Sequence, residues 1–291
     1  MRLSLALSLL CFLVPSIALA DPAETAQTRD QFEASLRYTR GEIELPGGIA
    51  RLRLSPEFRY LAPEDTERVL VDAWGNPSGD GTLGMLVPAQ YGATDPEAFG
   101  VIISYEEDGH VADDDAKEID YDDLLQTMQE DNREANAERE KQGYQPVELL
   151  GWAERPYYDA DAHKLHWAKR LRFGSGEGET LNYNIRILGR QGVLVLNAVA
   201  GMDQLEAIKP QLQSVLGFTD FTAGNGYADF DASTDKTAAY GLAALVAGGV
   251  AAKAGLFTKL IALLVAFKKL LVVAGLAVLG MVGRWFKARK E

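Results

Sequence analysis

Cysteine is almost absent from this sequence: its 291 residues include one, Cys11. Cys11 lies inside an N-terminal apolar run that we expect to be removed during export, which leaves the mature chain without cysteine. A chain without cysteine forms no disulfide, supplies no thiolate nucleophile and offers no thiolate to a metal ion. These three classes of site are therefore excluded.

Basic residues are scarce between residues 21 and 236. The formal net charge of the whole chain is −13. Residues 237–291 hold eight Lys and Arg against one Glu, and residues 1–20 hold one Arg, so residues 21–236 carry a net charge of −21. A domain this acidic repels phosphate backbones, which excludes nucleic acid as a partner.

Long apolar runs occur only at the two ends of the chain. Residues 1–20 combine a single charge at Arg2 with an apolar run over Leu3–Val14 and small residues at Ala18 and Ala20. This pattern predicts a secretory signal peptide that is cleaved after Ala20. An uncleaved anchor is the alternative, but the run is short for a membrane span of roughly 20 residues.

Residues 237–283 are predicted to anchor the chain in a membrane, either as one helix or as a helical hairpin. A first span near residues 237–258 contains one charge, Lys253, near its end, where lysine can reach the membrane surface. A second span would place Lys268 and Lys269 near its middle, at a cost of about 2.5 to 3.5 kcal/mol each. Both arrangements stay open.

The lipid bilayer is the first partner that we expect. Residues 284–291 form a basic tail after the apolar segment. Basic residues beside a membrane attract anionic headgroups.

The middle of the chain predicts an α+β domain, residues 41–236, after a polar, loosely held leader over residues 21–40. Apolar periodicity and turn residues predict strands and helices, and helices packed on an antiparallel meander give a mostly antiparallel sheet. The strands are expected at residues 50–54, 83–87, 99–105, 147–154, 164–173, 180–188 and 193–199, and the helices at residues 63–74, 121–142 and 202–212.

Two of these elements carry more detailed expectations. In residues 180–188, apolar residues alternate with Asn182, Asn184 and Arg186, so one face of this strand is expected to be buried. It joins an all-apolar strand through a hairpin at Arg190-Gln191. Pro210 is expected to bend or restart the last helix.

The acidic stretch from Glu106 to Asp115 is the clearest candidate for a metal site. Ca²⁺ and Mg²⁺ prefer carboxylate oxygens, which makes Asp113, Asp114 and Asp115 weak candidate ligands. Their spacing does not match an EF-hand loop, and neighbouring carboxylates in an extended loop point in different directions. We therefore favour a solvated turn leading to Asp120, the expected N-cap of the following helix. No cofactor is expected.

Two other groups have the composition of a catalytic or metal site but not its spacing. His163 and His166 are three residues apart, which puts them on opposite faces of the strand expected there. Ser175 lies between glycines, yet it lacks the strand-then-helix context of a nucleophile elbow and fits a hairpin loop. No catalytic residue is identified.

Eight short segments stand in order along the chain: Asp72–Pro77, Gly84–Pro88, Asp108–Ala116, Ile119–Asp122, Gly151–Glu154, His163–Lys169, Asn184–Arg190 and Asp235–Gly241. With these segments the chain resembles, from about Gly41 onward, an uncharacterised bacterial family of membrane-anchored proteins, the domain of unknown function family 2167. The resemblance implies a bacterial envelope protein with a C-terminal anchor and supplies no catalytic residues. The order of a meander followed by a helix also resembles PsbP-like domains.

The function expected from these features is that of a non-enzymatic interaction or scaffold module, tethered to the cytoplasmic membrane with its acidic domain on the periplasmic side. Its expected partner, besides the bilayer, is another envelope protein. Two alternatives stay open. One is an envelope hydrolase or cation-dependent enzyme that uses the acidic stretch, and the other is a small-ligand-binding domain.

Overall fold

The structure is a computed structural model that describes residues 29–76, 81–95, 97–141, 145–174 and 178–247. The chain divides into two compact units after Leu36. In the first unit, residues 29–34 are helical, and the Ser35 hydroxyl donates a hydrogen bond to the Phe32 carbonyl at 2.6 Å. All further description concerns the second unit, which begins at Arg37.

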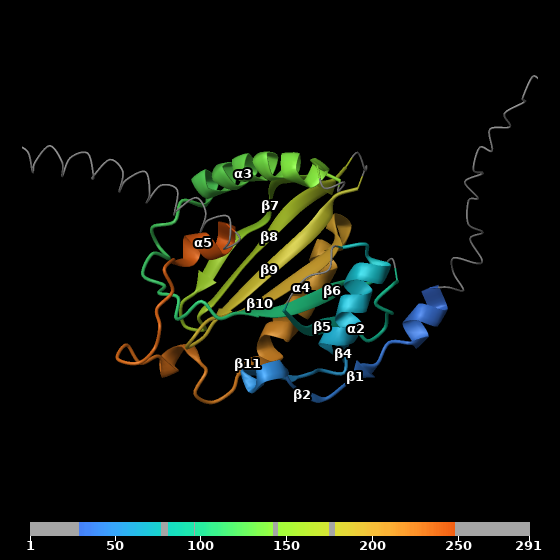
Figure 1. The fold of residues 1–291 in the computed structure, drawn as a ribbon, viewed down its shortest axis with the longest axis horizontal. Coiled ribbons are helices and arrows are strands. Elements are labelled where there is room, and N and C mark those ends of the chain that lie inside the picture. The colour runs from blue at the N-terminus through green and yellow to red at the C-terminus, as the bar shows by residue number, and fades with distance from the viewer. Residues whose placement is uncertain (1–28, 77–80, 96, 142–144, 175–177, 248–291) are drawn as a thin grey trace, which may run out of the picture. The chain divides into compact units, whose positions relative to one another are not determined.

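An antiparallel sheet of eight strands forms the centre of the second unit, in the order β1-β4-β5-β6-β10-β9-β8-β7 (Figure 1). The prediction of an α+β fold with a large antiparallel sheet is confirmed. The strands are β1 (Tyr38–Thr39), β4 (Phe58–Leu61), β5 (Thr82–Pro88), β6 (Gly100–Glu106), β7 (Val147–Asp159), β8 (Lys164–Phe173), β9 (Thr180–Leu188) and β10 (Val193–Gly201).

A smaller antiparallel sheet has the order β11-β3-β2. Its strands are β2 (Glu42–Glu44), β3 (Ala50–Arg53) and β11 (Thr219–Phe221). The helices are α2 (Pro63–Arg68), which continues as a π-helical turn (Val69–Ala73), α3 (Tyr121–Lys141), α4 (Leu205–Phe218) and α5 (Leu242–Ala247). Short 3₁₀ turns occupy Pro46–Gly48, Met202–Gln204 and Tyr227–Asp229.

The large sheet has a hydrophobic core on each face. On one face α4 and the small sheet pack against the strands, with Leu52, Ile185 and Leu212 among the buried side chains. On the other face, α3 and α5 pack against β7–β10, with Trp167 and Leu245 among the buried side chains. Figure 1 looks onto this second face, with α4 behind the strands.

Strand β9 is buried on both faces, whereas the sequence predicted burial of one. Leu181, Tyr183 and Ile185 face the α4 side as expected, and Asn184 and Arg186 on the other side are also buried, at 3% and 7% exposure. The reason is that α3 and α5 cover the face that the alternation assigned to solvent. This strand therefore carries polar and charged side chains into the interior of the domain.

Helix α4 runs without interruption through Pro210, where the sequence predicted a bend or a restart. Its buried side chains include Ile208, Leu212 and Val215, which follow helical spacing across the proline. Packing of this apolar face against the sheet holds the helix together despite the missing backbone N–H.

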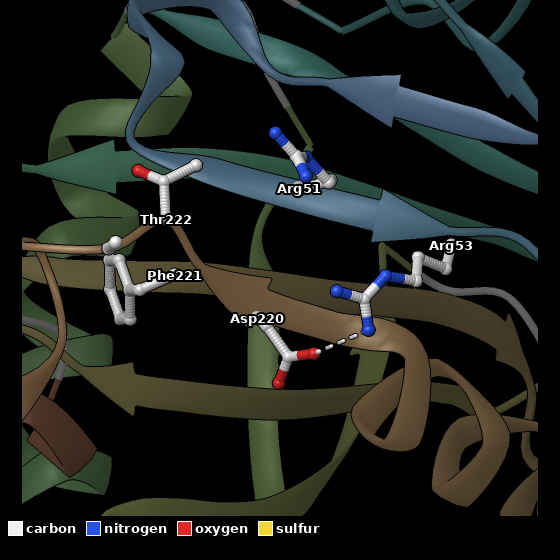
Figure 2. Close-up of a pocket in the computed structure, with 6 residues that line it drawn as sticks. Arg51, Arg53, Asp220, Phe221 and Thr222 are labelled. Carbon is white, nitrogen blue, oxygen red and sulfur yellow. Dashed lines mark ion pairs between the residues drawn. The ribbon is translucent and has the colours of Figure 1, made fainter.

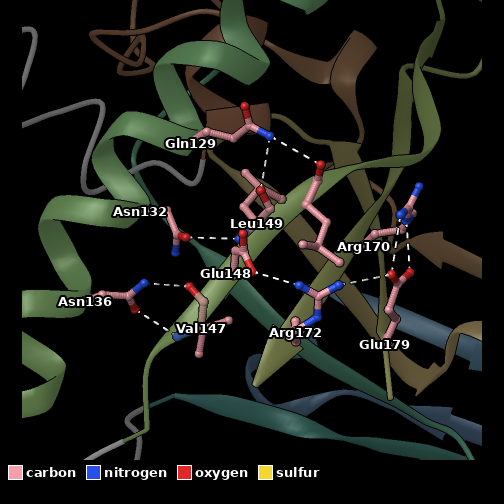
Figure 3. Close-up of polar contacts among 10 residues, drawn as sticks. Gln129, Asn132, Asn136, Val147, Glu148, Leu149, Arg170, Arg172 and Glu179 are labelled. Carbon is pink, nitrogen blue, oxygen red and sulfur yellow. Dashed lines mark hydrogen bonds and ion pairs between the residues drawn. The ribbon is translucent and has the colours of Figure 1, made fainter. Parts of the chain in front are cut away.

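Helix α3 lies along strand β7, the last strand of the sheet, and hydrogen-bonds to its backbone (Figure 3). The Gln129 amide donates to the carbonyls of Leu149 and Leu150, at 3.1 and 3.3 Å. Further along the helix, Asn132 accepts from the Leu149 N–H at 3.0 Å. An edge strand normally presents unpaired N–H and C=O groups to other chains. Here the amide side chains of α3 occupy such groups at the start of β7, in place of a ninth strand.

Two boundaries of the domain differ from the expected ones. Arg37 belongs to the domain, because its backbone N–H and its Nε both donate to buried Asp65, at 3.1 and 3.2 Å. At the other end, residues 237–247 pack into the domain, with Leu242, Leu245 and Val246 buried. In the part of the chain that the structure describes, no helix is long and apolar enough to cross a membrane. Residues 1–20, the expected signal peptide, and residues 248–283 of the expected anchor lie outside the described residues.

Candidate functional site

The three candidate metal ligands of the acidic loop (residues 107–115) have different surroundings. Asp113 accepts a hydrogen bond from the Tyr158 hydroxyl at 2.6 Å. Asp115 accepts from the backbone N–H groups of Leu242 and Ala243, at 3.2 and 3.5 Å. Asp114 is exposed and makes no hydrogen bond with a described residue. Within the described ranges, no three His, Cys, Asp or Glu side chains are grouped as metal ligands.

Asp113 forms a compact polar cluster with a tyrosine and a histidine. The Nδ1 atom of His163 lies 3.4 Å from the Asp113 carboxylate and 3.2 Å from the Tyr158 hydroxyl. Burial raises the pKa of Tyr158, and so does its hydrogen bond to Asp113. Burial alone would raise the pKa of Asp113, but the hydrogen bond from Tyr158, the nearby Tyr227 hydroxyl and the nearby His163 hold it below its usual value.

These shifts decide what the cluster can do chemically. A general base works best with a pKa near the working pH, and a nucleophilic tyrosine must lose its proton. The pKa of Asp113 moves down and those of Tyr158 and Tyr227 move up, in each case away from neutrality. The carboxylate therefore stays an acceptor and the hydroxyls stay donors, as in a structural hydrogen-bond network.

Four aromatic rings stack beside this cluster. His163 stacks on Tyr227 at 3.9 Å between ring centroids, Tyr227 contacts His110 at 4.3 Å, and His110 stacks on Phe230 at 3.9 Å. Burial lowers the pKa of His110, and its Nδ1 is buried without a hydrogen-bond partner. His110 is therefore a neutral, largely apolar member of the stack at neutral pH.

His163 has φ of 51°, the one positive φ of a non-glycine residue in the described ranges. The turn before it is closed by Asp159, whose side chain accepts from the N–H groups of Asp161 and Ala162, at 3.0 and 3.1 Å. Left-handed backbone costs of order 1 to 3 kcal/mol for such a residue and persists where its surroundings impose it. The contacts with Asp113 and Tyr227 supply that constraint.

His166 lies on the opposite face of the sheet, as the odd spacing predicts. Its Nδ1 is 3.1 Å from the Tyr183 hydroxyl, and its ring is 5.3 Å from that of Tyr157. Burial lowers its pKa. The two histidines do not form a chelating pair.

The acidic loop holds the closing segment (residues 235–247) against the domain. Besides the contacts of Asp115, the Tyr240 hydroxyl donates to Asp108 at 2.7 Å. The backbone N–H of His110 donates to the Lys236 carbonyl, and that of Ala238 donates to the His110 carbonyl, each at 2.8 Å. The carboxylates that suggested a cation site thus fix the start of the segment that was expected to enter the membrane.

Asp235 anchors the other side of the closing segment. Arg190, in the turn between β9 and β10, donates to its two carboxylate oxygens at 2.7 and 3.0 Å. This paired geometry is the strong form of an Arg–carboxylate contact, and it lowers the pKa of Asp235.

Two surface clefts lie near these groups. One, of about 430 Å³, is bordered by His163, Lys164 and Tyr227. The other, of about 220 Å³, lies on the small sheet, where Arg53 pairs with Asp220 at a distance of 3.9 Å. Figure 2 shows this pair. The neighbouring Arg51 pairs with Glu42 at 3.1 Å. The arginines of this second cleft are thus neutralised by acids of the same sheet.

Sequence reasoning missed Lys169 and Arg186, two cations on the buried face of the large sheet. The alternation in β9 assigned Arg186 to solvent. One pattern pointed the other way: the neighbouring strand β10 is apolar at almost every position, which indicates burial on both faces. A strand beside it is expected to be covered on both faces as well.

Comparison with known proteins gives a family and a few distant structures. The family model described as "Protein of unknown function (DUF2167)" matches residues 37–280. None of the curated proteins matches the chain.

Three solved structures share a partial likeness. Cyanobacterial PsbP (CyanoP) of Synechocystis has 11% identity and a TM-score of 0.35, covering 65% of this chain and 94% of its own. The Ran-binding protein Mog1p of Saccharomyces cerevisiae has 12% identity and a TM-score of 0.34, with coverage of 64% and 96%. LpqN of Mycobacterium tuberculosis, involved in cell envelope biogenesis, has 14% identity and a TM-score of 0.29, with coverage of 70% and 98%. Likenesses this low carry no conclusion about function.

Proposed function

The chain belongs to the DUF2167 family, and we propose that it is a non-enzymatic interaction or scaffold module of the bacterial cell envelope. In this proposal, residues 1–20 direct export, the apolar segment that ends at residue 283 holds the protein in the cytoplasmic membrane, and the acidic domain faces the periplasm. The signal-peptide pattern, the apolar C-terminal composition and the charge of −21 support it.

The observation that carries the proposal is that carboxylates of the acidic loop bind other parts of the same chain. Its carboxylates are the groups that the hydrolase or cation-dependent alternative requires. Asp108, Asp113 and Asp115 instead accept hydrogen bonds from Tyr240, Tyr158 and the first N–H groups of α5. Two of the four aspartates in the loop therefore attach the closing segment, and a third is bonded to Tyr158 of β7, which favours a structural role for the loop.

This attachment suits a scaffold. The closing segment is folded onto the domain as far as Ala247, within the residues that the sequence assigned to the anchor. A module whose end is fixed in this way presents its surface at a defined position relative to its attachment point, whereas a long polar linker would leave that position variable.

Membrane fractionation tests the attachment. The full-length protein is expected to stay with membranes through a high-salt wash and an alkaline wash, because burial of apolar residues is indifferent to salt while headgroup attraction is screened. Protease added to spheroplasts is expected to digest the acidic domain. Release by salt alone would contradict the anchor, and protection from protease would reverse the topology.

Crosslinking in intact cells tests the role. An interaction module is supported if an envelope protein is recovered with the full-length chain in a stoichiometric amount. Its recovery should be lost when a bulky tag shields the exposed surface of the acidic domain. If no partner is recovered and the purified protein turns over envelope material, with loss of turnover in Asp113→Asn, the enzyme alternative is correct.

A further inference from the structure

A cluster of hydrogen-bond donors lies on the large sheet, on the face that α3 and α5 cover. Trp167 and Lys169 alternate with residues of the opposite face along β8, and Arg186 comes from the neighbouring β9. In the register of these strands, Trp167 lies opposite Asn184, which precedes Arg186 by two residues on the same face of β9. We call Trp167, Lys169 and Arg186 the donor cluster.

Arg186 is a buried cation without an acidic partner. It is 7% exposed, and its Nη1 donates to the Ile185 carbonyl at 3.0 Å and to Asn197 Oδ1 at 3.2 Å. Burial lowers its pKa to about 10, while Glu106 and Tyr240 act on it in the opposite sense. Among the residues that the structure describes, no carboxylate comes within ion-pairing distance of it. A guanidinium has five N–H groups, so most of its donors are unused.

Lys169 is a second cation on this face of the sheet, and it too has no acidic partner among the described residues. Burial lowers its pKa to about 8, and the positive charge of Arg186 adds to this effect. Its ammonium group makes no hydrogen bond or ion pair with any described residue. It remains partly accessible, whereas Arg186 and Trp167 are buried.

Trp167 completes the cluster. Its side chain is fully buried, and its Nε1 has no hydrogen-bond acceptor in the described part of the chain. The Arg186 guanidinium carbon lies 5.1 Å from the centre of its ring. Three neighbouring groups therefore carry N–H donors that lack acceptors. An unsatisfied buried donor costs about 1 to 3 kcal/mol, and an unpaired buried charge costs more.

We propose that the donor cluster of Trp167, Lys169 and Arg186 binds the anionic group, a carboxylate or phosphate, of a small ligand. An oxyanion supplies several acceptors at once and neutralises the positive charge that the protein leaves unpaired. Guanidinium and ammonium groups are the donors that recognise such ions. The inference goes beyond the proposed function and does not depend on attachment to a membrane.

A cleft on the same face has room for the body of such a ligand. It has a volume of about 360 Å³ and lies between the α2 region and the sheet, with Asn182, Ser104 and Val199 on its floor. Asn182 lies opposite Lys169 in the strand register, which places the cleft next to the accessible member of the donor cluster. Leu70, Trp74, Leu171 and Phe173 also line it. A small molecule with a partly apolar body and one anionic end fits this lining.

Protection of Lys169 from acetylation tests the site on the full-length protein in detergent. An amine with a lowered pKa reacts readily with an acylating reagent, and mass spectrometry reports each lysine separately. Hexanoate or inorganic phosphate is expected to reduce labelling of Lys169 several-fold and to leave the exposed Lys117 unchanged. Hexan-1-ol, which lacks the charge, is expected to give no protection. Phosphatidylglycerol vesicles, used in place of hexanoate, distinguish a lipid headgroup from a free ligand.

A variant separates a binding role from a structural one. Lys169→Met replaces the partly accessible ammonium group by an apolar chain of similar length. If Lys169 serves binding, the variant without ligand melts at the same temperature as the wild type or higher, and the rise in Tm that anions give the wild type disappears. Lys117→Gln is the matched control and retains that rise.

Three results would overturn the proposal. The first is equal protection of Lys169 by hexan-1-ol and hexanoate, and the second is no protection by any anion. The third is a rise in Tm with anions that persists in Lys169→Met. Should Arg186→Gln fold, loss of anion protection at Lys169 in that variant would link the two cations to a single site.

Discussion

Asn136 of helix α3 and Val147 of strand β7 exchange two hydrogen bonds, as two residues of adjacent antiparallel strands do. The Asn136 Nδ2 donates to the Val147 carbonyl, and the Val147 N–H donates to the Asn136 Oδ1, each at 2.9 Å. A side-chain amide thus takes the place of a backbone peptide unit at the edge of the sheet. With Asn132 and Gln129, it closes an edge that could otherwise pair with another chain.

Asn136→Ala is expected to destabilise the domain and to favour self-association. The change removes both hydrogen bonds and leaves a part-buried N–H and C=O unpaired, which costs about 1 to 3 kcal/mol. Urea unfolding measures the loss of stability, and size-exclusion chromatography measures the association. Glu134→Ala, on the exposed side of the same helix, is the control and should leave both unchanged. Equal stability of the two variants would contradict the role of the amide.

The closing segment is expected to be part of the folding unit. A fragment of residues 37–247 should fold, while a fragment of residues 37–236, which lacks buried Leu242, Leu245 and Val246, should be less stable. Burial of each such side chain contributes about 1.5 to 3 kcal/mol, so the expected difference is on the order of 5 kcal/mol. Thermal unfolding of the two fragments measures it. Identical Tm values would show that α5 adds nothing to the core.

Neighbouring aspartates of the acidic loop are expected to differ in their effect on stability. Asp115→Ala removes the acceptor of the first N–H groups of α5 and should cost about 1 kcal/mol. Asp114→Ala should cost almost nothing, because Asp114 is exposed. Chemical denaturation of both variants provides the comparison. A larger loss in Asp114→Ala would mean that the exposed residue has a role of its own.

The acidic loop is predicted to have no tight cation site. Asp113 and Asp115 accept hydrogen bonds from Tyr158 and from α5, so their carboxylates are directed to different partners. Calorimetric titration with Ca²⁺ and Mg²⁺ is expected to show no micromolar binding. Micromolar binding that disappears in Asp114→Asn would contradict this prediction.

Stability is expected to fall as the pH drops below about 6.5, the pKa of an unperturbed histidine. Burial lowers the pKa of His110 in the folded state, so the unfolded chain takes up the proton first and is favoured by acid. His166 acts in the same direction. His110→Phe keeps the ring stack and should reduce the slope without abolishing it. The lowered pKa values of Asp113 and Asp235 act in a separate window, below about pH 4. An unchanged slope in His110→Phe would rule out His110 as the source.

Local sequence patterns predicted the elements of the sheet well where alternation and turns were regular. The bounds of β8 and β9 match the prediction residue for residue. The two-residue strand β1, the three-residue strands β2 and β11 and the four-residue strand β4 went unrecognised. Strands this short carry too few residues for a periodic pattern, and their pairing depends on partners distant in the sequence.

The candidate site could be predicted only in part. The sequence indicated that Asp113 to Asp115 would diverge, but not what each would contact. The ring of His110 contacts the ring of Tyr227, and the Tyr227 hydroxyl donates a hydrogen bond to the carbonyl of Val111, which lies 116 positions earlier in the chain. No local pattern encodes such a pairing. The apolar composition of residues 237–247 was equally ambiguous, because an apolar helix suits a protein core as well as a membrane.

The strand order of the large sheet has a consequence for how the chain folds. Strands β7 to β10 pair with their neighbours in sequence, whereas β6 pairs with β10, so Glu106 must find Val193. Contacts close in sequence form early, and distant ones require loop closure first. The meander β7–β10 can therefore assemble before β6 docks onto it. Strand β6 is synthesised before β7–β10 but joins the sheet after them. Until it does, the edge of β6 is exposed and can pair with other chains.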